Sequence, residues 1–136
     1  MRNFMILLLF LHVCVAKGSD IIGSWTYDCC TYITDSKGKL LTTVQGCTTY
    51  TYMFNKDGSG YLRCNDRYDY YWSFAWLERK GMLVLTSTGF VDFPFLGGRH
   101  IKVKVKKYKT KKYLKMELWR NTGDGKQTYI ILKRRL

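Results

Sequence analysis

Apolar and polar side chains alternate along most of this chain, and the alternation constrains the fold more than any other feature. In residues 101–107, for example, Ile101, Val103 and Val105 alternate with lysines. Successive side chains of a β-strand point to opposite faces of a sheet, so the pattern predicts strands with one buried and one solvated face. Eight such strands are predicted, at residues 25–33, 47–54, 60–65, 71–77, 82–86, 101–107, 114–118 and 127–133.

The segments between these strands are short and rich in turn residues. Asp57-Gly58 supplies the positive backbone angles that a hairpin loop needs, and a second glycine-rich turn spans residues 121–125. The one proline, Pro94, falls in the one long loop, and no segment shows a convincing helical period. Consecutive strands with short turns favour an all-β, eight-stranded antiparallel up-and-down barrel, because closure removes the unpaired edges.

The first eighteen residues have the pattern of a signal peptide. A short basic head precedes an apolar run at residues 4–15 that is too short to span a membrane. The triplets Cys14-Val15-Ala16 and Ala16-Lys17-Gly18 both offer small residues at the positions that a signal peptidase reads. We therefore expect residues 1–18 to be removed and residues 19–136 to form one domain of a secreted or periplasmic protein. A lipid anchor at Cys14 is the weaker alternative, because Val13 stands where such sites usually need a small residue.

Four cysteines follow the expected cleavage site, at positions 29, 30, 47 and 64. An even number of cysteines in an exported domain indicates disulfides. A bond between the adjacent Cys29 and Cys30 would be strained, so each is expected to join Cys47 or Cys64, and which joins which stays open. No CxxC pair is present and His100 is the one histidine after residue 18, so neither a metal site nor a cofactor is expected.

The positive charge of the chain is concentrated in its last part. The formal net charge is +13, and residues 99–136 hold fourteen lysines and arginines against Glu117 and Asp124. A field of this kind attracts anionic partners without naming them: an acidic glycan, a lipid surface or a protein surface. Export and the lack of a known motif argue against nucleic acid. The candidate anion-binding residues are Lys102, Lys104, Lys106, Lys115 and Arg120.

Two other functions stay open beside anion binding. The protein could carry a small apolar or aromatic ligand inside the barrel, although an eight-stranded barrel is about wide enough for side chains alone. It could also be a secreted inhibitor of another enzyme. Catalysis is not expected, because a nucleophile needs a positioned base and His100 stands among basic residues that oppose its protonation. The candidate ligand-lining residues are Tyr50, Tyr52, Trp72, Phe74 and Trp76.

The segment Gly23-Ser24-Trp25, directly after the expected signal peptide, resembles the Gly-x-Trp motif that opens the first strand of lipocalins. Together with the strand and turn sequences at 52–60, 72–76 and 82–86, it makes most of the chain similar to small secreted lipocalin-like domains of bacterial proteins. The resemblance implies that Trp25 closes one end of the barrel and packs against a late arginine, Arg134 or Arg135. The usual C-terminal helix of lipocalins is absent from this sequence.

Overall fold

The computed structural model describes residues 20–46, 49–66, 71–89, 92–93 and 96–136; the expected signal peptide, Cys47 and Pro94 lie outside these ranges. The described residues form β-strands and turns, with no helix that could cross a membrane. The strands are β1 (Gly23–Asp35), β2 (Leu40–Gln45), β3 (Tyr50–Phe54), β4 (Ser59–Cys64), β5 (Tyr71–Arg79), β6 (Met82–Ser87), β7 (His100–Lys109), β8 (Tyr113–Asn121) and β9 (Lys126–Arg135).

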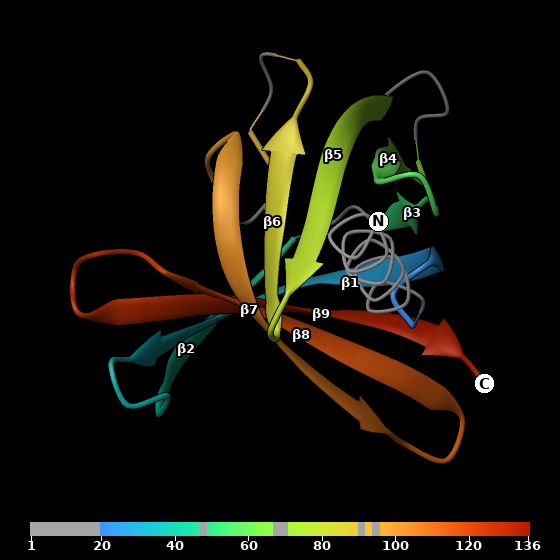
Figure 1. The fold of residues 1–136 in the computed structure, drawn as a ribbon. Coiled ribbons are helices and arrows are strands. Elements are labelled where there is room, and N and C mark those ends of the chain that lie inside the picture. The colour runs from blue at the N-terminus through green and yellow to red at the C-terminus, as the bar shows by residue number, and fades with distance from the viewer. Residues whose placement is uncertain (1–19, 47–48, 67–70, 90–91, 94–95) are drawn as a thin grey trace, which may run out of the picture.

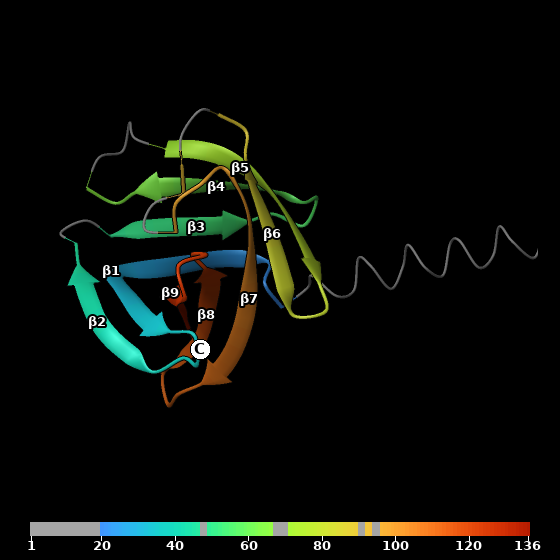
Figure 2. The same ribbon diagram turned by 90° about the vertical axis from the view of Figure 1, so that its left-hand side faces the viewer.

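Eight of these strands close into a barrel. Strands β3 to β9 pair with their neighbours in chain order, all antiparallel, and β1 pairs with β3 on one edge and with β9 on the other. Figures 1 and 2 show the resulting barrel from two directions. The all-β, eight-stranded antiparallel up-and-down fold expected from the alternation is therefore confirmed.

Strand β2 is the element that the sequence pattern missed. Strand β1 changes register between Tyr27 and Thr31, where Cys29 has a φ of 66°. Its first half pairs with β3, and its second half pairs with β2, which extends the sheet beside the barrel wall (Figure 1). All six side chains of β2 are exposed, so the strand has no buried face to produce an alternating pattern.

The inward side chains of the eight barrel strands form one core. Its largest fully buried members include Trp25, Tyr27, Tyr52, Phe54 and Phe74. The Phe54 ring of β3 meets the rings of Phe74 and Trp76 of β5 edge to face across β4, in the arrangement that their quadrupoles favour.

Gly60 makes this aromatic packing possible on β4. A Cβ atom at position 60 would lie 2.5 Å from the carbonyl oxygen of Met53 and 2.6 Å from a ring carbon of Phe74. Phe74 stands directly opposite Gly60 in the strand register. The Phe74 ring therefore occupies the space that a side chain at position 60 would need.

Candidate functional site

The residues predicted to line a ligand cavity form part of the core. Tyr52, Trp72, Phe74 and Trp76 are buried, and Tyr50 is half-buried against them. The ring centroids of Tyr52 and Phe74 are 6.4 Å apart, and the Trp76 indole nitrogen donates hydrogen bonds to two backbone carbonyls. These side chains pack against one another, so their surfaces already have partners within the barrel.

Tyr52 brings a polar group into this interior. The hydroxyl oxygen of Tyr52 is buried and forms no hydrogen bond with the described residues. Its burial raises the pKa of Tyr52 far above the ordinary value. The hydroxyl therefore stays protonated at physiological pH.

Trp25 and Arg134 meet at one end of the barrel. The Arg134 guanidinium lies 4.3 Å from the centre of the Trp25 ring and donates hydrogen bonds to the carbonyl oxygens of Ile22, at 2.7 Å, and Asp20, at 3.0 Å. Gly23 leaves room for this contact, because a Cβ atom there would lie 2.9 Å from an Arg134 nitrogen. Arg135 is exposed, so of the two candidate arginines Arg134 is the partner of Trp25.

Arg120 lies at the other end of the barrel and not among the exposed lysines. Its guanidinium donates hydrogen bonds to the carbonyl oxygens of Leu96 and Gly97, the second at 2.7 Å. The arginine thereby holds the β6–β7 connection over the barrel end. We leave Arg120 out of the anion-binding set, because its donors are engaged by the protein itself.

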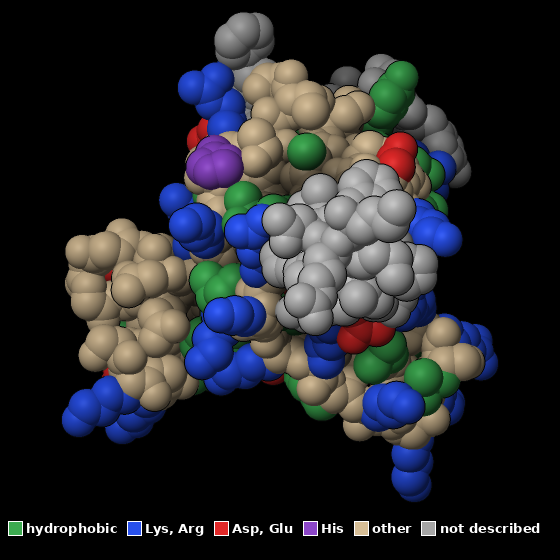
Figure 3. All heavy atoms as spheres, viewed as in Figure 1, with side chains coloured by type: hydrophobic (Ala, Val, Ile, Leu, Met, Phe, Trp, Pro, Cys, Tyr) green, Lys and Arg blue, Asp and Glu red, His purple; other side chains and the backbone are tan. Residues whose placement is uncertain are grey.

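The remaining predicted lysines share one outer surface, which we call the basic face: Lys102, Lys104 and Lys106 of β7 and Lys115 of β8. The three β7 side chains are exposed, whereas Lys115 is half-buried. Lys and Arg side chains lie in several groups on the side of the molecule seen in Figure 3, with few acidic side chains among them. The alternation in β7 thus places its apolar residues in the core and its lysines in solvent.

Glu117 is the one acidic residue in the three strands β7, β8 and β9. It stands opposite Lys106 in the register and accepts a hydrogen bond of 2.9 Å from the Trp119 indole nitrogen. Burial, together with the Glu117 charge, raises the pKa of the neighbouring Tyr108. Lys107 also forms ion pairs with Asp20 and Glu78, and these three carboxylates together leave most of the positive charge of the strands uncompensated.

An aromatic row on the outer surface was not foreseen from the sequence. Tyr129 of β9 stacks on Tyr32 of β1, with ring centroids 4.6 Å apart, and on Trp119 of β8, at 4.1 Å. The row continues to Lys106, whose ammonium lies 4.4 Å from the Trp119 ring. The signal for this row is bulky aromatics at outward positions, but only the strand register shows that they meet.

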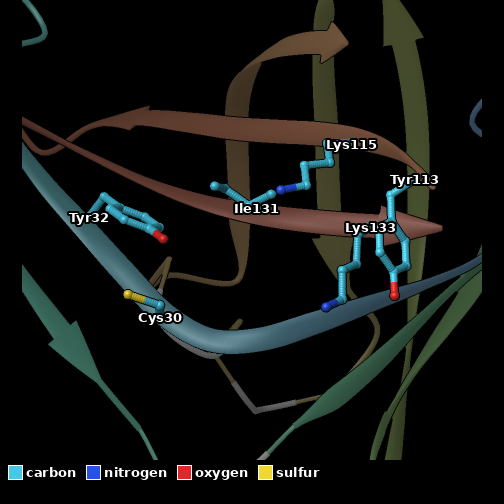
Figure 4. A pocket seen from close by; sticks show the side chains of 6 residues that line it. All are labelled: Cys30, Tyr32, Tyr113, Lys115, Ile131 and Lys133. Carbon is cyan, nitrogen blue, oxygen red and sulfur yellow. The ribbon is translucent and has the colours of Figure 1, made fainter. Parts of the chain in front are cut away.

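Beside this row lies a hollow of about 140 Å³. It is lined by Cys30 and Tyr32 of β1, Tyr113 and Lys115 of β8, and Ile131 and Lys133 of β9. Figure 4 shows Tyr32 and Tyr113 at opposite ends, with Ile131 between them.

Two lysines and a tyrosine–cysteine contact give this hollow its electrostatics. Lys115 stands directly opposite Lys133 in the register, and the Lys133 ammonium lies 5.0 Å from the Tyr113 ring. A hydrogen bond with the Cys30 side chain, together with partial burial, raises the pKa of Tyr32 to about 12. The hollow therefore presents two lysine side chains and, at neutral pH, the neutral hydroxyl group of Tyr32.

The described cysteines are not joined to one another. Cys29 and Cys64 are buried and Cys30 is half-buried, and no disulfide connects any two of the three. The expectation that Cys29 or Cys30 joins Cys64 is therefore wrong, and the alternative bonds to Cys47 lie outside the described residues. Within the described ranges, no group of three or more His, Cys, Asp and Glu side chains could hold a metal ion.

Comparisons of the chain with models of protein families, with curated proteins and with solved structures found no match in any of the three. The resemblance to lipocalin-like domains therefore stays a prediction that rests on residues 23–25 and on the strand pattern.

Proposed function

We propose that this protein is a secreted, non-enzymatic binding protein whose basic face takes anionic partners. The observation that carries the proposal is the charge of the outer surface of β7 and β8. Lys102, Lys104 and Lys106 lie two residues apart on one strand with exposed side chains, and Lys115 follows on the next strand. Glu117, opposite Lys106, is the one carboxylate that β7 and β8 contain.

Closely spaced exposed cations repel one another and concentrate counterions around them. A polyanion that replaces those counterions relieves the repulsion, and the exchange weakens as salt screens the charges over about 10 Å at 0.1 M ionic strength. The partner class that fits is an acidic glycan, an anionic lipid surface or an acidic protein surface. The packing of Tyr52, Phe74 and Trp76 within the core favours this outer surface over carriage of a small ligand inside the barrel.

Export and family membership are separate parts of the proposal. Residues 1–18 and the cysteine content support a secreted or periplasmic location. The Gly23-Ser24-Trp25 segment and the Arg134 contact with Trp25 support a lipocalin-like family.

The test compares two triple variants with the same change of charge. In the first, Lys102, Lys104 and Lys106 are changed to Gln. In the second, the exposed Lys37, Lys39 and Lys56, which lie in turns outside the basic face, are changed to Gln. Binding to long-chain heparin and to vesicles containing anionic lipid is measured across a salt series.

The wild-type protein and the turn variant should bind in a salt-sensitive manner, and the β7 variant should lose most of the binding while its unfolding midpoint stays unchanged. Equal binding by both variants would show that binding depends on the net charge of the protein and not on the basic face, which would also refute the proposal. Absence of salt-sensitive binding by the wild-type protein would refute the proposal.

A further inference from the structure

We propose that the hollow on the outer surface of β1, β8 and β9 binds one acidic sugar ring, a six-membered ring that carries a carboxylate or sulfate group, within an acidic glycan. The inference rests on the proposed function, because Lys115 belongs both to the hollow and to the basic face. The basic face attracts the glycan by charge, and the hollow in addition recognises one of its sugar rings.

The size of the hollow sets the size of its occupant. Its volume is about 140 Å³. A protein cavity of about 150 Å³ holds one benzene molecule, so the hollow matches the six ring atoms of a sugar, and the substituents of that ring extend out of the hollow.

The lining supplies complementary chemistry for such a ring. Half-buried Ile131 offers an apolar floor, and Tyr32 and Tyr113 offer hydroxyl groups at the two ends (Figure 4). The amino groups of Lys115 and Lys133 offer the cations that a carboxylate or sulfate requires. A sugar ring has both an apolar face and hydroxyl groups at its edge, so it can use each of these groups at once.

The position of the two lysines gives the anion a specific role. Lys115 and Lys133 occupy directly opposite positions on neighbouring antiparallel strands. Like charges placed in this way destabilise a strand pair. An acidic group bound between the two ammonium groups removes that repulsion, which is why the hollow selects a charged ring over a neutral one.

The aromatic row argues against a nucleotide base as the occupant. Proteins that bind single-stranded nucleic acid stack bases on open aromatic faces. Tyr129 has Tyr32 on one face and Trp119 on the other, and Trp119 has the Lys106 ammonium over its ring. The Lys133 ammonium lies over Tyr113 in the same way. These ring faces already have contacts within the protein.

The hollow also lies within reach of the rest of the basic face. Neighbouring strands are about 4.8 Å apart, so β7 runs about 10 Å from β9. A glycan chain with one ring in the hollow can therefore place its next acidic groups at Lys104 and Lys106. The hollow then fixes the position of a polymer that the lysines hold by charge.

The experiment blocks the hollow without changing any charge. Ile131→Trp fills the floor, and Leu77→Trp adds the same side chain at an exposed position on β5, where Leu77 is 48% exposed. The probes are a sulfated, uronic acid-containing disaccharide, a neutral disaccharide, inorganic sulfate, oligothymidylate and long-chain heparin. The readouts are amide chemical-shift titrations and the rate of alkylation of Cys30, which lines the hollow.

The acidic disaccharide should shift amides of β1, β8 and β9 and slow alkylation of Cys30, whereas the neutral disaccharide should do neither. Ile131→Trp should weaken disaccharide binding by about tenfold or more, equivalent to about 1.4 kcal/mol. Leu77→Trp should bind as the wild type does. Heparin should still bind Ile131→Trp in a salt-sensitive manner through β7.

Heparin binding without any disaccharide effect, or equal disaccharide binding by both Trp variants, would overturn the inference and leave the proposed function standing. Equal affinity for inorganic sulfate and the disaccharide would reduce the hollow to a simple anion site and also overturn it. If oligothymidylate binds and Ile131→Trp removes that binding, the occupant of the hollow is a nucleotide base and not a sugar ring, which also overturns the inference. Failure of heparin itself would overturn both proposals.

Discussion

Removal of the Trp25 side chain should destabilise the barrel more than loss of any basic-face lysine. The indole is 1% exposed, its nitrogen donates a hydrogen bond of 2.8 Å to the Ile21 carbonyl, and Arg134 covers its ring. Replacement of a buried Trp by Ala costs about 3–5 kcal/mol. Since whole domains are stable by about 5–15 kcal/mol, Trp25→Ala leaves a marginal protein, and Trp25→Phe provides a milder second variant.

Arg134→Met tests the other half of the contact. It removes a cation–π interaction of about 0.5–2 kcal/mol and the hydrogen bonds to the Ile22 and Asp20 carbonyls. Hydrogen bonds to charged groups contribute about 1.5–3 kcal/mol, and at this half-buried site competition from water lowers that contribution. The expected loss of unfolding free energy is therefore about 2–4 kcal/mol. Lys104→Ala, at an exposed position, should stay within about 0.5 kcal/mol of the wild type.

Equilibrium urea unfolding of Trp25→Leu, of Arg134→Met and of the variant that combines them measures the coupling between the residues, because leucine leaves no aromatic ring for the guanidinium. Because the side chains touch, the double variant should lose about 0.5–2 kcal/mol less than the sum of the single losses. Additive losses would refute the cation–π contribution. A Trp25→Ala loss no larger than that of Lys104→Ala would refute the view that this pair closes the barrel end.

Three further predictions follow from the packing, the ionisation and the cysteines. Gly60→Ala should cost about 1–3 kcal/mol or more in a urea titration, because its Cβ has no room, whereas Gly123→Ala, with open space around it, should show only backbone strain of about 1 kcal/mol. The pKa of Tyr32 is about 12 in the folded chain and about 10 when unfolded, so its contribution to stability should persist below about pH 10 and vanish as the pH rises towards 12; alkaline unfolding of Tyr32→Phe against the wild type checks this, and an identical pH profile would contradict it. Peptide mapping without reductant should find Cys47 in any disulfide of the exported protein, because Cys64 is a buried free thiol, and a bond to Cys64 would contradict the structure.

The barrel strands could be predicted because each has one buried and one solvated face. Ile101, Val103 and Val105 alternate with lysines because successive side chains of β7 point to the core and to solvent in turn. Strand β2 lies outside the barrel wall with both faces in solvent, so no burial shaped its sequence. Its presence depends on the register change in β1, which the alternation of apolar and polar residues along the sequence does not reveal.

The basic face could be predicted in part, and the hollow could not. Outward lysines follow from the same alternation, but Arg120 occupies an inward position at a barrel end, where its partners are loop carbonyls far along the chain. The hollow joins Cys30, Lys115 and Lys133 from three strands. Such neighbours are defined by strand register, which is a property of the closed sheet and not of any one segment.

The closure of the barrel by β1 and β9 also governs how the chain can fold. Thr26 pairs with Lys133, so the contact that completes the sheet joins the two ends of the described chain. Contacts between distant residues carry a large loop-closure entropy before they stabilise anything, and folds that depend on them form slowly. A growing or partly translocated chain without its last strand would hold two open sheet edges, at β1 and at β8. Folding is therefore completed only after the whole chain is free, an order of events that fits the export we propose.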